Sequence, residues 1–449
     1  MQSGGFISLK MEKTVSLHTL GCKLNYSETS TIASNFNQKG FKLKPFGESS
    51  DIFVLNTCSV TDNADKECRQ IIRSVLNNNP DTYVIVTGCY AQLQPDEISG
   101  IGGVDLVLGT NEKFKLFDYA DNFQKKSLSC VFTSPIKEAT DFEYAYSSDV
   151  DSRTRAFLKI QDGCDYNCSF CTIPLARGKS RSQPVYEVTQ NARKLLDLGY
   201  QEIVLTGVNT GDYISDAGEK KYRLIDVLYE LEKLNIPRIR ISSIEPNLLS
   251  DEIIQLVKSS EKFCKHFHIP LQSGDSETLK LMRRRYNKDY YENLLYKLNE
   301  EIPNIGIGVD VIVGFPQESD ERFNNTFGFL ESLPISYLHV FSYSERRKTH
   351  AASLPGSVNI SARKERSRIL RELSNKKRFN FYQTNVNKTH NVLFETAKED
   401  GYIYGFTENY IKVRVQASEG FENKILPVGI TKTDSYHFCE ALCNEMVLS

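Results

Sequence analysis

The sequence has no long apolar run and no secretion signal, and each absence excludes a class of protein. None of its 449 residues lies in an unbroken apolar stretch of about 18, the minimum for a membrane-spanning helix, and the mean hydropathy is −0.39. Residues 1–14 lack an apolar core followed by a small-residue cleavage site, so secretion is not expected. We therefore expect a cytoplasmic protein with no membrane partner, whose translation starts at Met1 or Met11.

The cysteines do not form the pattern of a disulfide-bonded protein. There are 11, an odd number, spread along the chain, whereas disulfide frameworks belong to small secreted domains. A chain of this length, with 40% hydrophobic and 25% charged residues, is expected to fold into two or three globular domains. Six cysteines stand in patterns that indicate metal binding. The other five are expected to be structural: Cys68, Cys130, Cys264, Cys439 and Cys443.

The most informative stretch is residues 163–171, where Cys164, Cys168 and Cys171 form a C-x3-C-x2-C motif. Thiolates this close in sequence meet at one point only if the chain loops around a metal centre. Cubane iron–sulfur clusters ordinarily take four thiolates, so three cysteines predict a cluster with one open iron that can bind a small molecule. The alternative is a zinc site. Zinc prefers four closed ligands in two C-x2-C pairs, and no second pair lies nearby.

This motif resembles that of the radical S-adenosylmethionine (SAM) superfamily. The resemblance implies that SAM binds the open iron through its amino and carboxylate groups. It also implies that an electron from the cluster cleaves SAM to a 5′-deoxyadenosyl radical. The protein is then expected to bind, orient and shield the cofactor that does this chemistry.

The N-terminal third contains three strand-like runs, residues 15–20, 52–56 and 83–86, that each lead into a cysteine. Helix-like stretches separate them at residues 25–38 and 63–76, and residues 104–108 are expected to form a fourth strand. This alternation predicts a parallel sheet, in which the carboxyl ends of the strands share one edge. The cysteines at that edge are Cys22, Cys58 and Cys89.

Two interpretations of these three cysteines remain open. Because they occupy the same topological place, they are expected to hold a second cluster, again with an open iron. The alternative is three buried free cysteines, which are individually common.

From residue 155 onward, strands and helices alternate regularly, which predicts a parallel barrel-like sheet. Six strand–helix units, rather than eight, indicate a partial barrel that is open on one side, as in the radical SAM superfamily. The strand candidates are residues 156–161, 202–207, 238–243, 266–271, 307–313 and 337–343. The helix candidates are residues 185–198, 224–234, 249–257 and 319–333.

The strand ends on the cysteine rim are the expected SAM-binding positions. The superfamily has a Gly-Gly-Glu-like motif at the second strand, whereas residues 206–209 are Thr-Gly-Val-Asn here. Glu245 follows the third strand, where it is placed to hydrogen-bond a ribose, and His266 and His268 are interpreted as core histidines. The candidate SAM contacts are Thr206, Gly207, Asn209, Ser243, Glu245 and Gly314, the last of which permits close approach of an adenine.

Basic charge is concentrated in one segment, although the net charge of the chain is only −2. Between Arg346 and Arg378 there are 11 Lys and Arg against 2 Glu, a local charge of +9, which leaves −11 on the rest of the chain. Residues 361–381 are expected to form a charged helix. From residue 387 the period falls to about 2, with a hairpin over residues 402–415, which predicts a small β-barrel.

Basic and aromatic residues on one face of such a barrel suit an RNA backbone. The alternative for the charged helix is an ordinary solvated face. The candidate RNA contacts are Arg346, Lys376, Lys377, Arg378, Lys412 and Arg414.

Over essentially its full length the chain resembles the radical SAM methylthiotransferase family. The resemblance implies an α/β protein with an N-terminal methylthiotransferase domain (1–133), a linker (134–150), a partial (β/α)6 radical SAM core (151–380) and a C-terminal RNA-binding TRAM β-barrel (381–449). Residues 21–25, Gly-Cys-Lys-Leu-Asn, and 173–178, Ile-Pro-Leu-Ala-Arg-Gly, are similar to the branch that acts on N6-threonylcarbamoyladenosine in tRNA.

The resemblance also implies the chemistry. Cys164, Cys168 and Cys171 would hold the SAM-cleaving 4Fe–4S cluster, and Cys22, Cys58 and Cys89 an auxiliary 4Fe–4S cluster that binds sulfur. SAM methylates that sulfur, and the radical from a second SAM activates C2 of the adenine, which receives the methylthio group. The implied partners are a tRNA anticodon stem-loop, an electron donor such as a flavodoxin or ferredoxin, and a sulfur donor that the sequence does not identify.

Three alternatives stay open at this point. Two are close variants, in which the enzyme modifies N6-isopentenyladenosine in tRNA or an aspartate of a ribosomal protein. The third belongs to another class: a non-catalytic RNA-binding metalloprotein that uses its clusters, or zinc, structurally.

Overall fold

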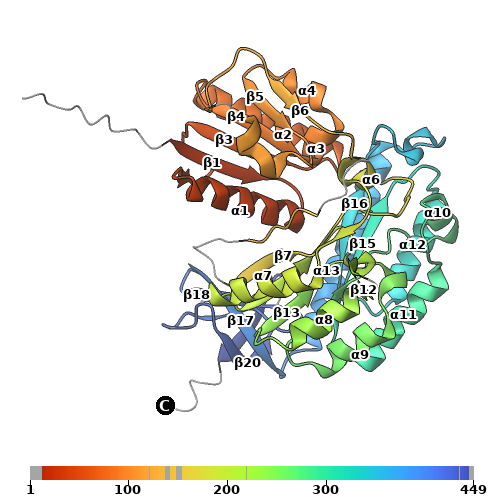
Figure 1. Ribbon diagram of the computed structural model, residues 1–449. Helices are drawn as coiled ribbons and strands as arrows, with labels where there is room; N and C mark the ends of the chain where they lie inside the picture. The colour runs from red at the N-terminus through yellow and green to blue at the C-terminus, as the bar shows by residue number, and fades with distance from the viewer. Residues whose placement is uncertain are drawn as a thin grey trace, which may run out of the picture. The chain divides into compact units, whose positions relative to one another are not determined.

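The computed structural model describes residues 13–120, 122–136, 142–147, 154–218, 220–433 and 435–443. The chain divides into two compact units, residues 1–139 and 140–449, and Figure 1 shows the elements of each. Met1 and Met11 lie outside the described residues, as does part of the predicted linker. Within the described residues, no helix is long and apolar enough to cross a membrane.

The first unit is a parallel sheet with helices on both faces, as the sequence predicted. The strand order is β2-β1-β3-β4-β5-β6, and every neighbouring pair is parallel. Its elements are β1 (Thr14–Thr19), α1 (Lys23–Gln38), β2 (Lys42–Lys44), β3 (Ile52–Thr57), α2 (Asp62–Asn78), β4 (Tyr83–Gly88), α3 (Cys89–Leu93), α4 (Pro95–Ser99), β5 (Val104–Leu108), η1 (Lys113–Lys115), α5 (Leu116–Tyr119) and β6 (Cys130–Phe132).

The central strands of this sheet are buried on both sides. Leu55 of β3 packs with Ile72 of α2 on one face, and its neighbour Val54 packs with Phe36 of α1 on the other. Such strands read as continuous apolar runs rather than as alternating ones. The two edge strands, β2 and β6, were not predicted, because each has only three residues.

The second unit begins with the predicted partial barrel. Two parallel sheets, β13-β10-β7 and β14-β15-β16, are linked by a parallel bridge between Ser243 and His268. The strands are β7 (Arg155–Lys159), β10 (Glu202–Thr206), β13 (Arg238–Ile241), β14 (His266–His268), β15 (Gly306–Val313) and β16 (Tyr337–Ser342). The helices are α6 (Ile173–Arg177), α7 (Val185–Asp197), α8 (Leu224–Glu232), α9 (Asp251–Ser259), α10 (Ser276–Leu281), α11 (Lys288–Glu301) and α12 (Asp320–Ser332).

The helices between these strands cover the outer face of the barrel (Figure 1), where their apolar sides form one large core with alternate strand residues. The expected fourth strand, 266–271, is shorter than predicted and ends at His268. Short elements that were not predicted are β8 (Gln161–Asp162), β9 (Arg181–Ser182), β11 (Ile214–Ala217), β12 (Lys220–Arg223), η3 (Thr210–Asp212), η4 (Pro246–Leu248) and η5 (His350–Ser353).

The chain ends in a charged helix and a small closed barrel, both as predicted. The helix is α13 (Ile360–Gln383), and the barrel has the order β17-β18-β19-β21-β20. Its strands are β17 (Thr389–Glu399), β18 (Tyr402–Phe406), β19 (Lys412–Gln416), β20 (Ile425–Lys432) and β21 (Cys439–Cys443).

The small barrel is fixed to the amino ends of the β7–β16 strands. Arg238, the first residue of β13, donates to the carbonyls of Phe406 (2.8 Å) and Asn391 (2.6 Å). The guanidinium of Arg240 stacks on the ring of Tyr410, 3.7 Å from the centre of that ring. The cysteine motif follows the first strand at the carboxyl rim, so the motif and the small barrel occupy opposite ends of the same parallel sheet.

Candidate iron–sulfur and cofactor site

The loop of residues 164–171 is held by backbone contacts from distant segments. Ser169 donates its N–H to the carbonyl of Met282 (3.1 Å) and accepts from the N–H of Ala351 (2.7 Å). Gly163 begins the loop at φ +71°, and a Cβ there would lie 2.0 Å from a backbone oxygen. Only glycine suits this close approach.

The three thiols of this loop share a buried environment. Burial, together with the charge of neighbouring motif cysteines, raises the pKa of Cys164 and of Cys171 to about 12. Burial also raises the pKa of Cys168, against the opposing charge of Arg284. Buried thiols of this kind are poor free nucleophiles, whereas a metal centre deprotonates its thiol ligands. The donor set therefore fits an iron–sulfur cluster.

Arg284 is a functional candidate that the sequence reasoning missed. Its side chain is 3% exposed, its Nη1 donates to Cys168 Sγ at 3.1 Å, and its Nη2 is paired with Glu245. Hydrogen bonds to cluster sulfurs tune reduction potential. Sequence offered no clear signal, because Arg284 is the middle of three consecutive arginines and lies 116 residues from Cys168.

Gln161 ties the cysteine loop to the end of the second barrel strand. Its Nε2 donates to the carbonyl of Gly163 (2.8 Å) and to Ser180 Oγ (3.0 Å), while its Oε1 accepts from the N–H of Asn209 (2.9 Å). Gly207 lies against the same side chain, since a Cβ there would be 2.8 Å from Gln161 Oε1. The predicted contacts at residues 206–209 thus lie beside the cysteine loop.

Two of those predicted contacts fit a bound polar molecule. Thr206 Oγ1 and both amide atoms of Asn209 are buried, and none of the residues that the structure describes hydrogen-bonds to them. Buried polar atoms normally have partners. The amino-acid part of SAM carries the charged donors and acceptors that would satisfy these groups.

The other predicted SAM contacts have partners within the protein. Ser243 Oγ is hydrogen-bonded to His268 Nδ1 at 2.8 Å, and Glu245 is paired with Arg284. At Gly314, with φ +76°, a Cβ would lie 2.2 Å from Arg363 Cγ. Packing against α13 therefore accounts for this glycine without an adenine.

The two histidines of β14 differ. His266 is 1% exposed and its Nε2 is hydrogen-bonded to the hydroxyl of Tyr337 at 2.9 Å, which confirms a core histidine. The side chain of His268 is 16% exposed, so its interpretation as a core residue is wrong. Nothing in the sequence separates them, because both lie on the same face of one short strand.

In the first unit, Cys22, Cys58 and Cys89 follow β1, β3 and β4. These strands are parallel neighbours, so their carboxyl ends share one edge, as predicted. Cys58 and Cys89 are 8% and 5% exposed, and Cys22 is exposed. Three cysteine thiols at one edge of the sheet are a donor set that fits a second iron–sulfur cluster.

Side chains next to these cysteines join the three strand ends. Asn25 Nδ2 donates to the carbonyls of Leu20 (2.7 Å) and Thr57 (3.1 Å), and Thr57 Oγ1 donates to the carbonyl of Thr87 (2.5 Å). The sequence did not predict the Asn25–Thr57 and Thr57–Thr87 hydrogen bonds, because each joins residues about one strand–helix unit apart.

Gly21 and Gly88 allow the loops to pack this closely. Gly21 has φ +106°, and a Cβ there would lie 2.7 Å from Cys58 Cβ. Gly88 has φ +99°, and a Cβ there would lie 2.5 Å from the carbonyl oxygen of Thr57. Both glycines therefore permit the tight turns that precede Cys22 and Cys89.

The remaining cysteines are integrated into packing. Cys68 is fully buried in the first unit, and Cys439 and Cys443 belong to the core of the small barrel. Cys264 is 3% exposed. Cys130 packs beside the second apolar cluster of the first unit.

The predicted RNA contacts near α13 differ in exposure. Arg346 is only 6% exposed, and Lys377 Nζ donates to the carbonyls of Glu331 and Leu333, each at 2.7 Å. These two side chains are therefore poorly placed to meet a phosphate. The side chain of Lys376 is 66% exposed.

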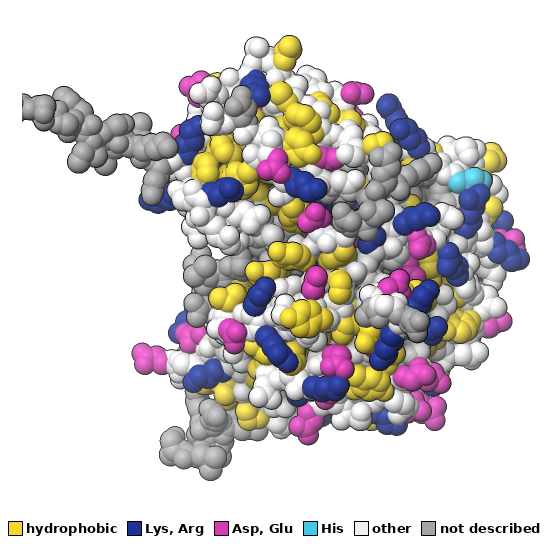
Figure 2. Space-filling model, in the orientation of Figure 1, with side chains coloured by type: hydrophobic (Ala, Val, Ile, Leu, Met, Phe, Trp, Pro, Cys, Tyr) yellow, Lys and Arg dark blue, Asp and Glu magenta, His cyan; other side chains and the backbone are white. Residues whose placement is uncertain are grey.

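The small barrel presents basic and aromatic side chains together. Lys412 Nζ lies 4.5 Å from the centre of the Tyr404 ring, and the guanidinium of Arg414 lies 4.4 Å from that of Tyr402. Aromatic and cationic groups of this kind stack with bases in single-stranded RNA. On the face shown in Figure 2, Lys and Arg are interspersed with Asp and Glu rather than gathered in one patch.

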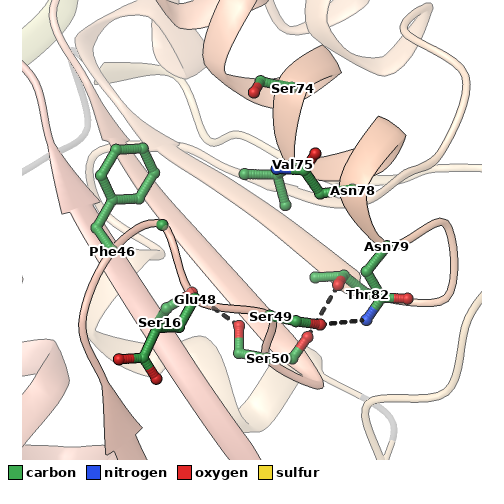
Figure 3. Close-up of a pocket in the computed structure, with 11 residues that line it drawn as sticks. Ser16, Phe46, Glu48, Ser49, Ser50, Ser74, Val75, Asn78, Asn79 and Thr82 are labelled. Carbon is green, nitrogen blue, oxygen red and sulfur yellow. Dashed lines mark hydrogen bonds between the residues drawn. The ribbon is translucent and has the colours of Figure 1, made fainter.

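The first unit also has a cavity of about 60 Å³, lined mainly by polar side chains (Figure 3). Its lining includes Ser50 and Thr82, which precede β3 and β4 and so lie at the amino ends of the strands. The hydroxyls bond one another or the backbone, including Ser16 Oγ with Ser50 Oγ at 2.7 Å. Such satisfied groups give the cavity no evident chemistry.

Together, the partial barrel and the cysteine loop at its carboxyl rim define a radical SAM protein. Residues 158–330 match the model of the radical SAM superfamily, and residues 14–109 match that of uncharacterized protein family UPF0004. A solved structure with a similar fold is the radical SAM methyltransferase TsrM from Kitasatospora setae, with a TM-score of 0.55 and 15% identity, covering 76% of this chain and 77% of that one. At this identity the likeness concerns the fold alone.

The sequence relatives are more specific. The chain is 40% identical to threonylcarbamoyladenosine tRNA methylthiotransferase MtaB of Bacillus subtilis, over 93% of this chain and 94% of the relative. It is 38% identical to MtaB of Aquifex aeolicus, over 89% and 96%. It is 30% identical to the tRNA-2-methylthio-N(6)-dimethylallyladenosine synthase of Bacillus subtilis, over 96% and 85%.

The chain therefore belongs to the radical SAM methylthiotransferase family. Membership confirms the class of enzyme that the cysteine patterns predicted. It also implies two 4Fe–4S clusters and SAM as cofactors. The alternative of a non-catalytic metalloprotein does not agree with this membership.

Proposed function

We propose that this protein converts N6-threonylcarbamoyladenosine next to the tRNA anticodon to its 2-methylthio derivative. The observation that carries the proposal is the similarity to MtaB proteins, at 35–40% identity over about nine-tenths of the chain. The dimethylallyladenosine synthases are less similar, at 29–31%. Modification of isopentenyladenosine is the second candidate, because those relatives also match over most of the chain.

We infer that each three-cysteine site holds one cluster. Cys164, Cys168 and Cys171 supply the thiolates for the SAM-cleaving 4Fe–4S cluster, and a second set supplies those for the auxiliary cluster: Cys22, Cys58 and Cys89. When bound, the first cluster would supply the electron for SAM cleavage, and the auxiliary cluster would supply the sulfur for transfer. Three ligands in each set leave one iron open.

The neighbouring side chains bind and orient the reactants. Thr206 Oγ1 and the amide of Asn209 supply buried donors and acceptors for the amino-acid part of SAM. Gln161 holds Asn209 and the cysteine loop at a fixed spacing. Arg284 donates to the Cys168 sulfur while its second nitrogen holds Glu245, so the thiolate and the carboxylate are positioned by one guanidinium.

RNA binding is assigned to the small barrel and to the exposed part of α13. Tyr402 and Tyr404 of β18 lie against Arg414 and Lys412 of the neighbouring strand β19. This combination of rings and cations supports contacts with the anticodon stem-loop. We expect a cytoplasmic enzyme that receives electrons from a flavodoxin or a ferredoxin. The sulfur donor is not specified by any feature of the chain.

The test is nucleoside analysis of tRNA from a strain that lacks this gene. The 2-methylthio derivative of threonylcarbamoyladenosine should be absent, and the unmodified threonylcarbamoyladenosine should accumulate. Loss of the isopentenyladenosine derivative instead would assign the second candidate function. Persistence of both methylthio nucleosides, with no paralogue present, would reject the tRNA activity.

A further inference from the structure

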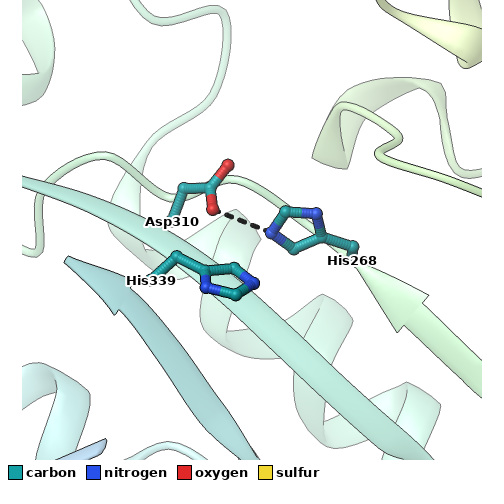
Figure 4. A group of neighbouring side chains, drawn as sticks. All are labelled: His268, Asp310 and His339. Carbon is teal, nitrogen blue, oxygen red and sulfur yellow. Dashed lines mark hydrogen bonds and ion pairs between the residues drawn. The ribbon is translucent and has the colours of Figure 1, made fainter. Parts of the chain in front are cut away.

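The inner face of the partial barrel carries a polar cluster that the proposed roles leave unused. It consists of His268, Asp310 and His339 (Figure 4), together with Ser243, and is called here the lumen group. Ser243 Oγ is hydrogen-bonded to His268 Nδ1 at 2.8 Å, and His268 Nε2 to Asp310 Oδ1 at 2.8 Å. The His339 ring stands edge-on to that of His268, with centres 5.3 Å apart.

The strand pattern explains why these side chains face inward. In β15, Val309 and Val311 are fully buried in the core under the helices, so Asp310 between them points to the opposite face of the sheet. Asp310 pairs in register with His339 of β16. Figure 4 shows the carboxylate and both imidazole rings turned toward one another.

The lumen group is closed below and accessible above. Two register positions below it, on the same face, the Tyr337 ring fills the space over Gly308, where a Cβ would lie 2.4 Å from that ring. The side chains of His268 and Asp310 are 16% and 19% exposed, and His339 is exposed. A molecule that enters from the carboxyl rim can therefore reach all three.

A short chain of contacts connects the lumen group to the cysteine loop. Arg284 touches Cys168 Sγ and is paired with Glu245. Glu245 lies two residues from Ser243, which holds His268. These residues connect the inner face of the barrel, where Asp310 and His339 lie within β15 and β16, to the rim of the SAM-cleaving site, where a substrate base has to be presented.

The substituents of the two candidate substrates differ in chemistry. A threonylcarbamoyl group offers urea N–H donors, a hydroxyl and a carboxylate, whereas a dimethylallyl group is hydrocarbon. Asp310 accepts hydrogen bonds, and an imidazole N–H donates to carboxylates. The guanidinium of Arg378 lies 5.3 Å from the centre of the Tyr337 ring beneath the group, so positive charge stands near the closed end of the group.

We propose that the lumen group is the recognition site for the threonylcarbamoyl substituent, with Asp310 and His339 in direct contact and His268 and Ser243 as positioning residues. This inference rests on the proposed function and names the part of the chain that selects its substrate. Burying a hydrocarbon there would remove water from the carboxylate of Asp310 and the imidazole of His339 without offering hydrogen bonds in return, which penalises the wrong substrate strongly. The lumen group therefore rejects dimethylallyl as well as accepting threonylcarbamoyl.

The same three residues could receive a divalent cation, since their ligand atoms lie within 4.8 Å of one another. The hydrogen bonds of His268 favour the threonylcarbamoyl group over a cation. His268 uses both ring nitrogens, one for Ser243 and one for Asp310. A cation would have to replace the His268–Asp310 bond before it could use either atom.

The experiment compares two anticodon stem-loop RNAs, one with threonylcarbamoyladenosine and one with isopentenyladenosine, using reconstituted enzyme. His339→Leu and Asp310→Asn should each lower kcat/KM on the threonylcarbamoyl RNA by about 100-fold. Neither should lower it on the isopentenyl RNA, so the selectivity ratio falls. Formation of 5′-deoxyadenosine without RNA should stay at the wild-type rate, which a general folding defect would not allow.

The matched controls are His350→Leu and Asp289→Asn, at exposed positions of the second unit outside the lumen. Both should keep the wild-type selectivity. A measurement on the wild-type enzyme needs no variant: threonylcarbamoyladenosine nucleoside should compete with the RNA about tenfold better than its methyl ester, which lacks the charge of the carboxylate.

The outcomes separate this inference from the proposed function. If the wild-type enzyme modifies the threonylcarbamoyl RNA and both variants match it, the lumen group is not the recognition site although the function stands. If the wild-type enzyme modifies only the isopentenyl RNA, the proposed function fails. If turnover responds to added Zn²⁺ or Mn²⁺ and His339→Leu abolishes that response, the lumen group is a cation site and the inference is overturned.

Discussion

The two three-cysteine sites of this protein use the same number of thiols but are built differently. Cys164, Cys168 and Cys171 lie in one short loop, and a local turn at Gly163 brings them together. The thiols of the first unit are separated by entire strand–helix units and share one edge of the sheet only because β1, β3 and β4 are parallel neighbours. The first arrangement is a property of a loop, and the second is a property of a sheet.

Because the two sites are built differently, we expect mutations to affect them differently. The loop site depends on its own backbone and on a few contacts such as that of Arg284 with Cys168. The sheet site depends on long-range hydrogen bonds, chiefly those of Asn25 and Thr57. Damage to the fold of the first unit should therefore remove the auxiliary cluster first.

The largest effects are expected from removing each set of thiols. Replacing Cys164, Cys168 and Cys171 by Ala should abolish formation of both 5′-deoxyadenosine and methylthiolated RNA, because no site for SAM cleavage remains. Replacing Cys22, Cys58 and Cys89 should abolish the RNA product but leave reductive SAM cleavage. Chromatographic analysis of the nucleosides measures both. Full SAM cleavage by the first triple variant would contradict the assignment.

The next effect tests the dependence of the auxiliary site on the sheet. Gly88→Ala places a Cβ 2.5 Å from the carbonyl oxygen of Thr57 at a φ of +99°, which costs at least about 1–3 kcal/mol of folding free energy. The variant should lose iron from the auxiliary site and unfold at lower urea concentration, yet still cleave SAM. Gly40→Ala is the matched control: it also has positive φ, but a Cβ there meets nothing within 4 Å. Equal loss of iron from both variants would show that backbone strain alone is responsible.

A smaller effect is expected at Arg284. Arg284→Lys keeps a positive charge near Glu245 but loses the fork that also reaches Cys168 Sγ. Loss of such an outer contact typically costs about 10–100-fold in activity. The reduction potential of the SAM-cleaving cluster should fall, because a donor to its sulfur is removed. Redox titration by electron paramagnetic resonance measures the shift, with Arg283→Lys, an exposed neighbour, as the control. An unchanged potential would make Arg284 purely structural.

The smallest effect separates ligand cysteines from packed ones. Cys68 is fully buried beside the auxiliary site, and its Sγ lies 3.9 Å from the carbonyl oxygen of Cys58. Cys68→Ala should leave the iron content unchanged and lower the free energy of unfolding by about 1 kcal/mol through a small cavity. Iron analysis and urea denaturation measure the two quantities. A loss of about four irons would make Cys68 a ligand.

An effect of similar size is expected on the pH dependence of stability, through a carboxyl–imidazole pair of the small barrel. Burial, the largest single influence, would raise the pKa of Glu408, but the hydrogen bond with His390 and the charges of His390 and Arg238 together outweigh burial and lower that pKa below the ordinary value. A carboxyl with a lowered folded-state pKa stabilises the fold above its unfolded-state pKa, and this stability is lost as pH falls through the folded-state pKa. Glu408→Gln should therefore flatten the acid side of the stability profile. An unchanged profile in urea unfolding would remove this pair from the pH dependence.

The sequence predicted the layout of the molecule because its signals are local. Apolar runs marked the buried strands of the first unit, and helical periodicity marked α7, α8 and α12. Short edge strands such as β2, with three residues, carry too little pattern to be detected. The predicted rim positions of the six cluster cysteines followed from topology, since the carboxyl ends of parallel strands coincide.

The side-chain partners could not be predicted in the same way. Arg284 meets Cys168 from 116 residues away, and Asp310 meets His268 from 42 residues away. Such contacts depend on barrel curvature and strand register, which periodicity does not specify. Arg346 shows the opposite error: a basic residue in a charged segment was expected to be exposed, but it is 6% exposed.

The most direct test of two separate cluster sites is iron content combined with electron paramagnetic resonance, with and without SAM. The reconstituted wild-type enzyme should hold about eight irons per chain, and each triple cysteine variant about four. SAM should change the spectrum of the variant that keeps Cys164, Cys168 and Cys171, and leave unchanged that of the variant that keeps the other three. Loss of all iron from either variant, or a SAM response in the wrong one, would contradict the assignment.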